Sequence, residues 1–199
     1  MLLDLSALGV AIVTVLAMEP WSRIVHEHLW HRALYVVHRT HHPPEGQPRP
    51  LVEANDAFAV VHAVPATVMI GLGFWGIVDG VLGHVLLGVG SGMALYGFAY
   101  TVAHDGLAHG RLPVAFLNRS RWLRRIRAAH EIHHRDGGPP YGFFRGPAEL
   151  KAASGRTRGR FGASRRSEVG HADGAMQAPD DRDVGGGLRG PAPASGPEL

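Results

Sequence analysis

The sequence predicts an all-α integral membrane protein, a bundle of three or four transmembrane helices capped by a cytoplasmic helical region that carries a histidine cluster. Three observations predict this fold: long uncharged apolar segments, basic residues gathered on one side of them, and histidines that repeat in a fixed order. The chain has 199 residues, enough for one domain plus an appendage. It contains no cysteine, which excludes disulfides, zinc–thiolate sites and cysteine nucleophiles. Any metal would therefore be held by nitrogen and oxygen ligands.

Three segments are candidate membrane spans. Residues 2–18 are mostly apolar and lack the basic start and small-residue cleavage site of a secretory signal. Residues 57–78 and 80–103 carry no formal charge. As helices they would extend roughly 33 and 36 Å, enough to cross a hydrocarbon core of about 30 Å. A helix hairpin in the core of a soluble protein is the alternative, but two adjacent uncharged segments of this length are rare there. Small residues of the third span would let helices approach closely in lipid: Gly83, Gly88, Gly90, Ser91, Gly92 and Gly97.

The topology follows from the short connection between the second and third spans. Only Asp79 and Gly80 separate them, so they form a tight hairpin whose two ends lie on the same side of the membrane. Arginines gather on that side, in residues 19–56 and after the third span. By the positive-inside rule this side is cytoplasmic, and we expect a multi-pass protein of a bacterial cytoplasmic membrane.

Two further helices are expected on the cytoplasmic side. One covers residues 19–42 and ends at Pro43-Pro44, and the other covers 117–134 and ends at Gly137-Gly138-Pro139. Residues 112–123 could form a fourth short span or lie in the membrane interface. Their charged and polar side chains favour the interface.

The composition changes near residue 148. Residues 1–147 form the expected membrane-embedded domain and carry all but one of the 14 histidines. Residues 148–199 form a Gly/Arg/Pro-rich tail with few large apolar side chains, and we expect 152–199 to be disordered. Its arginines are solvated or weakly attracted to anionic lipid. The pI of 9.8 therefore does not indicate a nucleic-acid partner.

The histidines follow one order twice: a span, then HxxxxH, then HxxHH. Within HxxHH, offsets of three and four place the rings on one helical face, so two can reach one metal ion and the third a neighbouring ion. An offset of five turns the rings about 140° apart on a regular helix. HxxxxH therefore needs a wide turn, a π-bulge, or ligands that serve different ions, and Gly106 makes a local break plausible in the second copy. Ten histidines suit two ions with coordination positions left open. The ten are His26, His31, His38, His41, His42, His104, His109, His130, His133 and His134.

Other polar residues accompany these ligands. A ligand histidine usually gives its other N–H to a carboxylate or amide, which fixes its tautomer. Glu53, Asn55, Asp56 and Asp105 are predicted for this role, although Asp56 could simply cap the following span. Other histidines lie outside the repeated pattern: we interpret His62 and His84 as helix-packing donors inside the spans, and leave His28 open as a ligand.

Several motifs resemble a known family. HEHLWH, HRTHH, VEANDAFAVV, YGFAYTVAHDGLAHGR and AAHEIHH resemble the bacterial and plant β-carotene 3-hydroxylases, part of the fatty-acid hydroxylase and sterol desaturase superfamily. The resemblance covers about residues 8–147, includes YGFF at 141–144, and is most specific in HDGLxHxR. It implies a non-haem di-iron centre held by the ten histidines at the cytoplasmic face. The chain departs from the family in its long tail and in DGGPPYGFF.

The resemblance also implies an activity. It is the O2-dependent hydroxylation of β-ionone rings, from β-carotene to β-cryptoxanthin to zeaxanthin, with two Fe(II) ions as cofactors and O2 as co-substrate. Electrons would come from reduced ferredoxin and its NADPH-dependent reductase, because the sequence has no dinucleotide-binding loop or haem motif. The arginines of 119–127 are a candidate docking face for this donor. The carotenoid would enter from the bilayer between the spans, with aromatic wall residues expected at Trp75, Tyr96, Phe98 and Tyr100.

Two alternatives remain open from sequence. One is a sterol or fatty-acyl hydroxylase or desaturase of the same superfamily, against which the carotenoid-type HDGLAH argues. The other is a non-enzymatic membrane protein that binds or transports zinc. It would need polar ligands inside the spans, where only His62, His84 and Asp4 are available.

Overall fold

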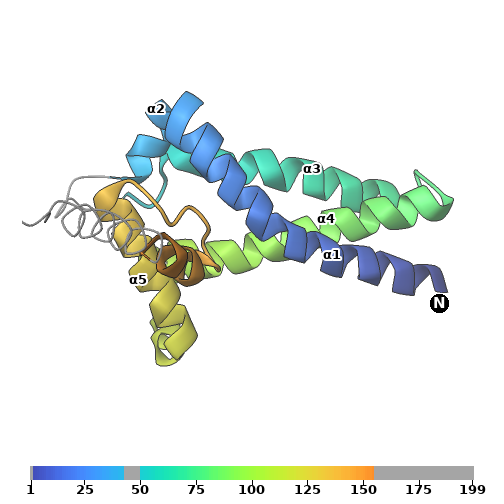
Figure 1. Ribbon diagram of the computed structural model, residues 1–199. Coiled ribbons are helices and arrows are strands. Elements are labelled where there is room, and N and C mark those ends of the chain that lie inside the picture. Colours follow the sequence, from blue (N-terminus) through green and yellow to red (C-terminus); the bar gives the residue numbers. More distant parts are fainter. Residues whose placement is uncertain (1, 43–49, 155–199) are drawn as a thin grey trace, which may run out of the picture. The chain divides into compact units, whose positions relative to one another are not determined.

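The computed structural model describes residues 2–42 and 50–154, all within one compact unit, Met1–Thr157. Across these residues every regular element is a helix (Figure 1), which confirms the predicted fold class. Pro43-Pro44, expected to end the first cytoplasmic helix, and residues 155–199, most of the tail expected to be disordered, lie outside the described residues.

Three helices form the apolar part of the protein: α1 (Leu2–Val25), α3 (Ala57–Phe74) and α4 (Gly80–Thr101). With their helical extensions they give three segments long and apolar enough to cross a membrane, Leu5–Ala33, Ala54–Phe74 and Gly80–Ala108. These overlap the three expected spans. Residues 112–123 are not among the described segments that could span. They contain a short 3₁₀ helix, η5 (Ala115–Arg119), and the start of α5 (Arg121–Asp136).

α4 is the central helix, because α1 and α3 both pack against it. Close approach depends on its glycines. A Cβ at Gly92 would lie 2.6 Å from the Ala11 carbonyl oxygen of α1, and a Cβ at Gly90 would lie 2.6 Å from the Ala66 carbonyl oxygen of α3. Gly97 was expected to have the same role, and this expectation was wrong: a Cβ there would meet nothing within 4 Å.

The hairpin between α3 and α4 has a turn of five residues, 75–79, rather than the two-residue connection expected. The helix ends early because Gly76 takes a left-handed conformation, with φ of 63°. This allows the Val78 N–H to donate to the Leu72 carbonyl at 3.0 Å, a bond that satisfies the end of the helix.

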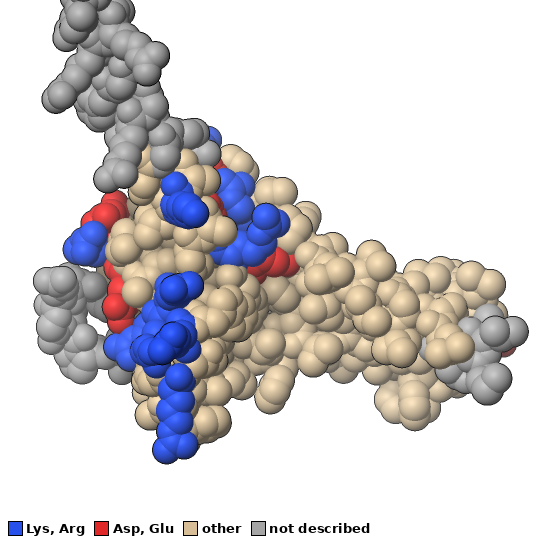
Figure 2. All heavy atoms as spheres, turned by 60° about the horizontal axis from the view of Figure 1, so that its bottom comes forward, with Lys and Arg blue, Asp and Glu red and all other residues tan. Residues whose placement is uncertain are grey.

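Both histidine-rich segments lie at the end of the bundle opposite this turn. After α1 the chain continues through η1 (His26–Ala33), α2 (Tyr35–His38) and η2 (Arg39–His41). After α4 it continues through η4 (Val102–Ala108), η5 and α5. α2 and α5 therefore lie at the same end of the bundle (Figure 1), as the hairpin topology predicts. Arginine side chains gather at this end, while the surface over the spans is largely uncharged in the view of Figure 2.

The ends of α5 are defined by its sequence. Ser120 precedes the helix, and its side chain accepts a hydrogen bond from the Leu123 N–H at 3.4 Å. The helix ends at Gly137, whose φ of 67° again requires the left-handed region. α5 thus begins four residues later and ends two residues later than the expected 117–134.

The expected domain boundary at 147 falls inside a helical stretch, residues 146–154. Glu149 in this stretch accepts hydrogen bonds from the backbone N–H groups of Tyr141 and Gly142, at 3.3 and 3.0 Å. It also pairs with Arg23 of α1 at 3.2 Å. The described residues after 147 therefore pack against the membrane-embedded part.

Candidate metal centre

The ten predicted ligands fall into two groups of five. Within each group, one ring nitrogen from every histidine lies within 4.8 Å of the others, a spacing that could hold a metal ion. We call the groups site A and site B. Site A contains His26, His31, His38, His42 and His133, and site B contains His41, His104, His109, His130 and His134.

π-Helical turns place both HxxxxH pairs, one of the three geometries that the sequence allowed. η1 carries His26 and His31, and η4 carries His104. The His109 N–H donates to the His104 carbonyl five residues earlier, at 3.0 Å. This wider turn brings residues five apart to the same side of the helix, so each pair belongs to a single site. In η4, Gly106 is required by packing, since a Cβ there would lie 2.5 Å from a Val114 methyl group.

Each HxxHH segment divides its histidines between the two sites. In the first segment the outer histidines belong to site A and the middle one, His41, belongs to site B. In the second segment the outer histidines belong to site B and the middle one, His133, belongs to site A. Each half of the chain thus gives four histidines to one site and one histidine to the other.

The Nε2 atoms converge at the centre of each site. In site A, Nε2 of His31 and Nε2 of His133 are 3.1 Å apart, and in site B the Nε2 atoms of His41 and His104 are also 3.1 Å apart. The same approach, at 2.9–3.1 Å, is made by His26–His38, His42–His38, His109–His130 and His134–His130.

The other ring nitrogen, Nδ1, faces an acceptor in His26, His38, His41, His104 and His133. Side chains accept in three cases: Asn55 from His38 at 2.7 Å, Glu53 from His41 at 2.8 Å, and Asp105 from His104 at 2.8 Å. Backbone carbonyls accept in two more, Tyr141 O from His26 at 2.8 Å and Gly138 O from His133 at 2.6 Å.

These contacts decide the tautomer. A ring that donates through Nδ1 in its neutral form has a lone pair at Nε2. Two lone pairs that face each other at about 3 Å repel, so the convergence of Nε2 atoms fits a cation at the centre of each site. The donor set is therefore compatible with a pair of metal ions held by imidazole nitrogen.

Burial keeps these imidazoles neutral. Desolvation lowers the pKa of His38 to about 4, of His42 to about 3 and of His133 to about 4, and the neighbouring histidines lower them further. The pKa values of His41 and His130 are also well below the ordinary value, again through burial. The neutral form is the one that binds a metal ion.

Arg111 supports site B, a role that was not predicted from the sequence. Its largely buried guanidinium pairs with Asp56 at 2.6 Å and with Asp105 at 3.5 Å, and it donates to the Leu51 carbonyl. Asp105 accepts from His104, so the arginine holds a carboxylate that orients a ligand. The sequence contained a signal, because Arg111 is the last residue of the HDGLxHxR motif.

Asp56 acts one step further from the histidines than predicted. Its carboxylate accepts the Glu53 N–H at 2.9 Å, in the capping box of η3 (Ala54–Asp56), the short 3₁₀ helix that leads into α3. Glu53 in turn accepts from His41. Asp56 is thus both a helix cap, the simpler of its two predicted roles, and a link between Arg111 and Glu53.

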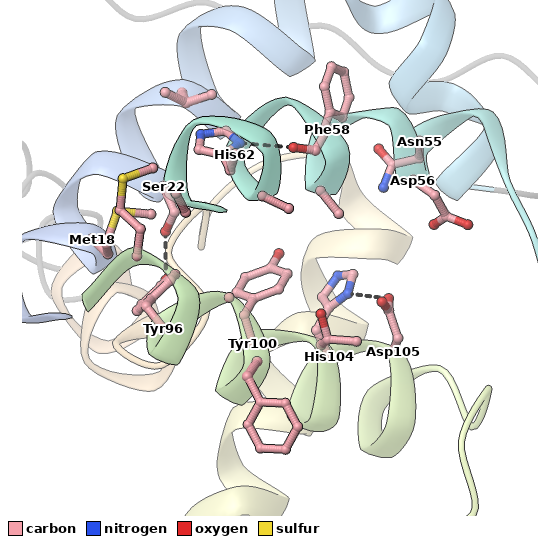
Figure 3. A pocket seen from close by; sticks show the side chains of 18 of the residues that line it. Met18, Ser22, Asn55, Asp56, Phe58, His62, Tyr96, Tyr100, His104 and Asp105 are labelled. Carbon is pink, nitrogen blue, oxygen red and sulfur yellow. Dashed lines mark hydrogen bonds and ion pairs between the residues drawn. The ribbon is translucent and has the colours of Figure 1, made fainter. Parts of the chain in front are cut away.

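An apolar cavity of about 360 Å³ leads from the histidines into the bundle between α1, α3 and α4 (Figure 3). Both sites contribute to its lining, through His26 and His38 of site A and His41 and His104 of site B. Three predicted wall residues line it, Tyr96, Phe98 and Tyr100. The fourth was wrong: Trp75 is 75% exposed in the α3–α4 turn, at the far end of the bundle.

The remaining histidines lie outside both sites. His28 is on η1, but its side chain is 53% exposed and lies 4.0 Å from Glu27. His62 and His84 each donate from Nδ1 to the backbone carbonyl four residues earlier, at 2.8 and 2.7 Å. Both bonds lie within the histidine's own helix, so as donors these side chains do not pack one helix against another, as the sequence interpretation expected.

Glu19 is a buried carboxylate for which the sequence predicted no role. It accepts from the Tyr96 hydroxyl at 2.7 Å and from the Arg145 N–H at 2.8 Å. It therefore ties α1 to α4 and to the segment whose Tyr141 carbonyl orients His26. A single acidic residue at the end of an apolar run offers little signal of such contacts.

Comparisons with known proteins agree with this geometry. Residues 11–147 match the family described as fatty acid hydroxylase. The chain is 40% identical over 149 residues to a chloroplastic beta-carotene 3-hydroxylase of Gentiana lutea. The matched residues are 74% of this chain and 45% of that protein. It is 39% identical over 149 residues to beta-carotene 3-hydroxylase 1 of Arabidopsis thaliana, covering 74% and 46%. It is 35% identical over 157 residues to a beta-carotene hydroxylase of Pseudescherichia vulneris, covering 76% and 84%.

The match to the plant relatives spans less than half of their length. No solved structure matches the chain. The family match covers the second and third spans, most of the first and all ten clustered histidines, and the sequence motifs had predicted the same superfamily. The chain belongs to the fatty acid hydroxylase family.

Proposed function

We propose that the protein is a β-carotene 3-hydroxylase that converts β-carotene to β-cryptoxanthin and then to zeaxanthin. The observation that carries this proposal is the apolar cavity between the spans, which ends at histidines of both sites. The names of the relatives point to the same ring chemistry. A reacting ring at the inner end of the cavity would lie next to both sites, while the rest of an apolar chain stays among the spans.

The cofactors we propose are two Fe(II) ions, one in site A and one in site B. Five imidazoles in each site leave a coordination position open on an ion that takes six ligands. Bound iron would supply the activation of O2 that ring hydroxylation needs and that side chains cannot provide. In the balanced reaction the ring C–H, O2, two electrons and two protons give the ring C–OH and one water.

The chain's own residues prepare the site for this chemistry. The Nδ1 acceptors Asn55, Glu53 and Asp105 fix ring orientation and keep Nε2 free of a proton. Aromatic rings cover the sites on the cavity side: Tyr100 stacks on His104, with centroids 4.6 Å apart. These contacts limit the access of water to the reacting end of the cavity.

The electron donor we propose is a reduced ferredoxin, kept reduced by an NADPH-dependent reductase. Arg121, Arg124 and Arg125 lie together on the first half of α5 and offer a cationic face to an acidic partner (Figure 2). We also propose that the histidine end of the bundle faces the cytoplasm of a bacterial cell, because these arginines lie at that end and basic residues favour the cytoplasmic side.

Expression in bacteria that accumulate β-carotene tests the proposed activity directly. Chromatography of the pigments should show cryptoxanthin and zeaxanthin. The matched control is the His41→Ala variant, which should reach the membrane and leave β-carotene unchanged. If the wild-type protein is present in the membrane and no hydroxylated pigment forms, the substrate assignment is wrong.

Metal analysis separates this proposal from the alternatives. Two irons per chain with O2-dependent turnover support a hydroxylase, whereas stoichiometric zinc without turnover would support a zinc-binding protein. Activity on an added sterol or fatty-acyl lipid, with none on carotenoid, would point to another member of the superfamily.

A further inference from the structure

The cavity has one side that is not closed by helix packing. α4 packs against both α1 and α3, but α1 and α3 do not pack against each other along their described length. The cavity is nevertheless lined from both, by Met18 and Ser22 of α1 and by His62 and Ala63 of α3 (Figure 3). Between these two helices its wall is made of side chains alone.

Two side-chain pairs bridge this gap; Trp30, Phe58 and His62 line the cavity, and Trp21 covers His62 from the outer side. Nearer the histidine sites, Trp30 of η1 stacks on Phe58 of α3, with centroids 4.5 Å apart and planes 11° apart. Further into the bundle, the indole N–H of Trp21 donates to Nε2 of His62 at 3.3 Å. His62 can accept because its Nδ1–H already donates to the Phe58 carbonyl.

The two pairs differ in how firmly they are held. Phe58 is only 9% exposed, and Trp30 and Phe58 both pack against His38 of site A. Trp21 is 51% exposed on the outer surface of α1, and its bond to His62 is longer than the usual 2.9–3.0 Å. The Trp21–His62 contact is therefore the weaker part of the wall, and a rotation of one indole ring would break it.

α1 and α3 are each held tightly to α4 next to the cavity. A Cβ at Gly92 or at Gly90 would lie 2.6 Å from the backbone of α1 or α3, so neither helix can separate from α4 without losing this close packing. At the histidine end, Arg111 pairs with Asp56 and Asp105. An apolar molecule in the bilayer meets the least resistance between α1 and α3.

We propose that the long apolar substrate enters the cavity from the bilayer between α1 and α3, and that Trp21 and His62 form the gate. This inference rests on the proposed carotenoid hydroxylase function. An elongated polyene suits such an entrance, because one ring can reach the histidine sites while the rest of the molecule remains between the helices and in lipid.

The absence of cysteine from the chain allows a clean test. In a Trp21→Cys/His62→Cys variant, a reducible bifunctional thiol reagent would join α1 to α3 across the gate. In vesicles that contain β-carotene, we expect the joined protein to turn over at least tenfold more slowly. Reduction of the cross-link should restore the rate, and the iron content should not change.

The matched control is Val60→Cys/Val64→Cys, treated with the same reagent. These residues are one turn apart on α3, 58% and 56% exposed, and outside the cavity lining, so the link does not bridge two helices. Its turnover should be the same before and after reduction. The single variants Trp21→Cys and His62→Cys report the effect of attached reagent without a bridge.

A second variant keeps the test independent of the cross-link. Trp21→Phe retains a ring and removes the N–H, so the gate should open more easily. A hydrogen bond between helices contributes on average little to stability in membranes. Loss of the Trp21–His62 bond should therefore raise the turnover rate at low β-carotene only about threefold, and kcat should not change.

Equal rates in the joined and released gate variant, or an unchanged rate at low β-carotene in Trp21→Phe, would overturn the proposed entrance while leaving the hydroxylase function in place. A wild-type protein that makes no hydroxylated pigment would refute the function itself.

Discussion

Nε2 of His133 lies 3.1 Å from Nε2 of His31, although 102 residues separate them in the chain. His133 sits on α5 among histidines of site B, and yet it completes site A. His41 makes the reverse exchange, because it follows the site A histidine His38 and lies 3.1 Å from His104 of site B. Neither site can form from one half of the chain alone, so the two halves must dock before either metal ion is fully held.

The exchanged residues should therefore be indispensable. His133→Ala removes one of five site A nitrogens, and we expect its iron content to fall from about two to about one per chain, with turnover lost on the order of a hundredfold or more. Iron analysis of the purified protein and pigment analysis in carotene-accumulating cells measure the two effects. His41→Ala should give the same pattern through site B.

The control for these variants is His28→Ala. His28 belongs to the same π-helix as His26 and His31, but its side chain is half exposed and outside both sites. Iron content and turnover should match the wild type. A loss of iron as large as that of His133→Ala would show that His28 is a ligand and that the assignment of site A is incomplete.

Arg111 should control the affinity of site B for its metal. Its guanidinium holds Asp105 against His104 and holds Asp56, which caps the Glu53 that orients His41. We expect Arg111→Gln to weaken iron binding about 10–100-fold, the usual cost of losing an outer partner of a metal ligand. Titration of the metal-free protein with Fe(II) should show one weakened and one unchanged site.

The matched arginine control is Arg127→Gln. Arg127 pairs with Glu131 one turn later on α5, and both side chains are exposed, so the pair contributes little. If Arg127→Gln weakened iron binding as much as Arg111→Gln, the loss of any positive charge would explain the effect. The contacts of Arg111 with Asp56 and Asp105 would then not be its cause.

The spans could be predicted from sequence because hydropathy and length are local properties. Residues 57–78 and 80–103 are mostly apolar and carry no formal charge, and no tertiary contact is needed to recognise them. The boundary at Phe74 could not be predicted, since it depends on the left-handed conformation of Gly76. The open surroundings of Gly97 could not be predicted either, because only the packing of α4 shows which glycines face a neighbour.

The membership of the histidine cluster was predictable because the HxxxxH and HxxHH spacings repeat. Their division between sites was not, since the sequence only shows that one histidine of each HxxHH can turn to a neighbouring ion. Which one turns depends on how α5 crosses the segment of His38 and His41. Arg111 was missed for a similar reason, because its partner Asp56 is 55 residues away.

Close packing at Gly92 should be essential to the bundle. A Cβ at this position would lie 2.6 Å from Ala11 O and from the Thr14 Cβ, and backbone cannot yield as a flexible side chain does. We expect Gly92→Ala to reduce the free energy of unfolding by about 1–3 kcal/mol, the usual cost of overpacking. Thermal unfolding in detergent measures this loss. Gly9→Ala, on the open face of α1, gains helix propensity and should not lower the unfolding temperature; an equal loss in both variants would mean that the close packing at Gly92 is not responsible.

Truncation should locate the functional end of the domain after Glu149. Glu149 accepts two backbone N–H groups, from Tyr141 and Gly142, and thereby fixes the segment whose Tyr141 carbonyl accepts the Nδ1–H of His26. A chain of residues 1–154 should keep its iron and its turnover, whereas a chain of residues 1–147 should lose iron from site A. The Glu149→Gln variant removes the charge but keeps the full chain. It should lower the free energy of unfolding by about 1.5–3 kcal/mol, the usual contribution of hydrogen bonds to a charged group. Full iron content in both the 1–147 chain and Glu149→Gln would show that the Tyr141 carbonyl is held without Glu149.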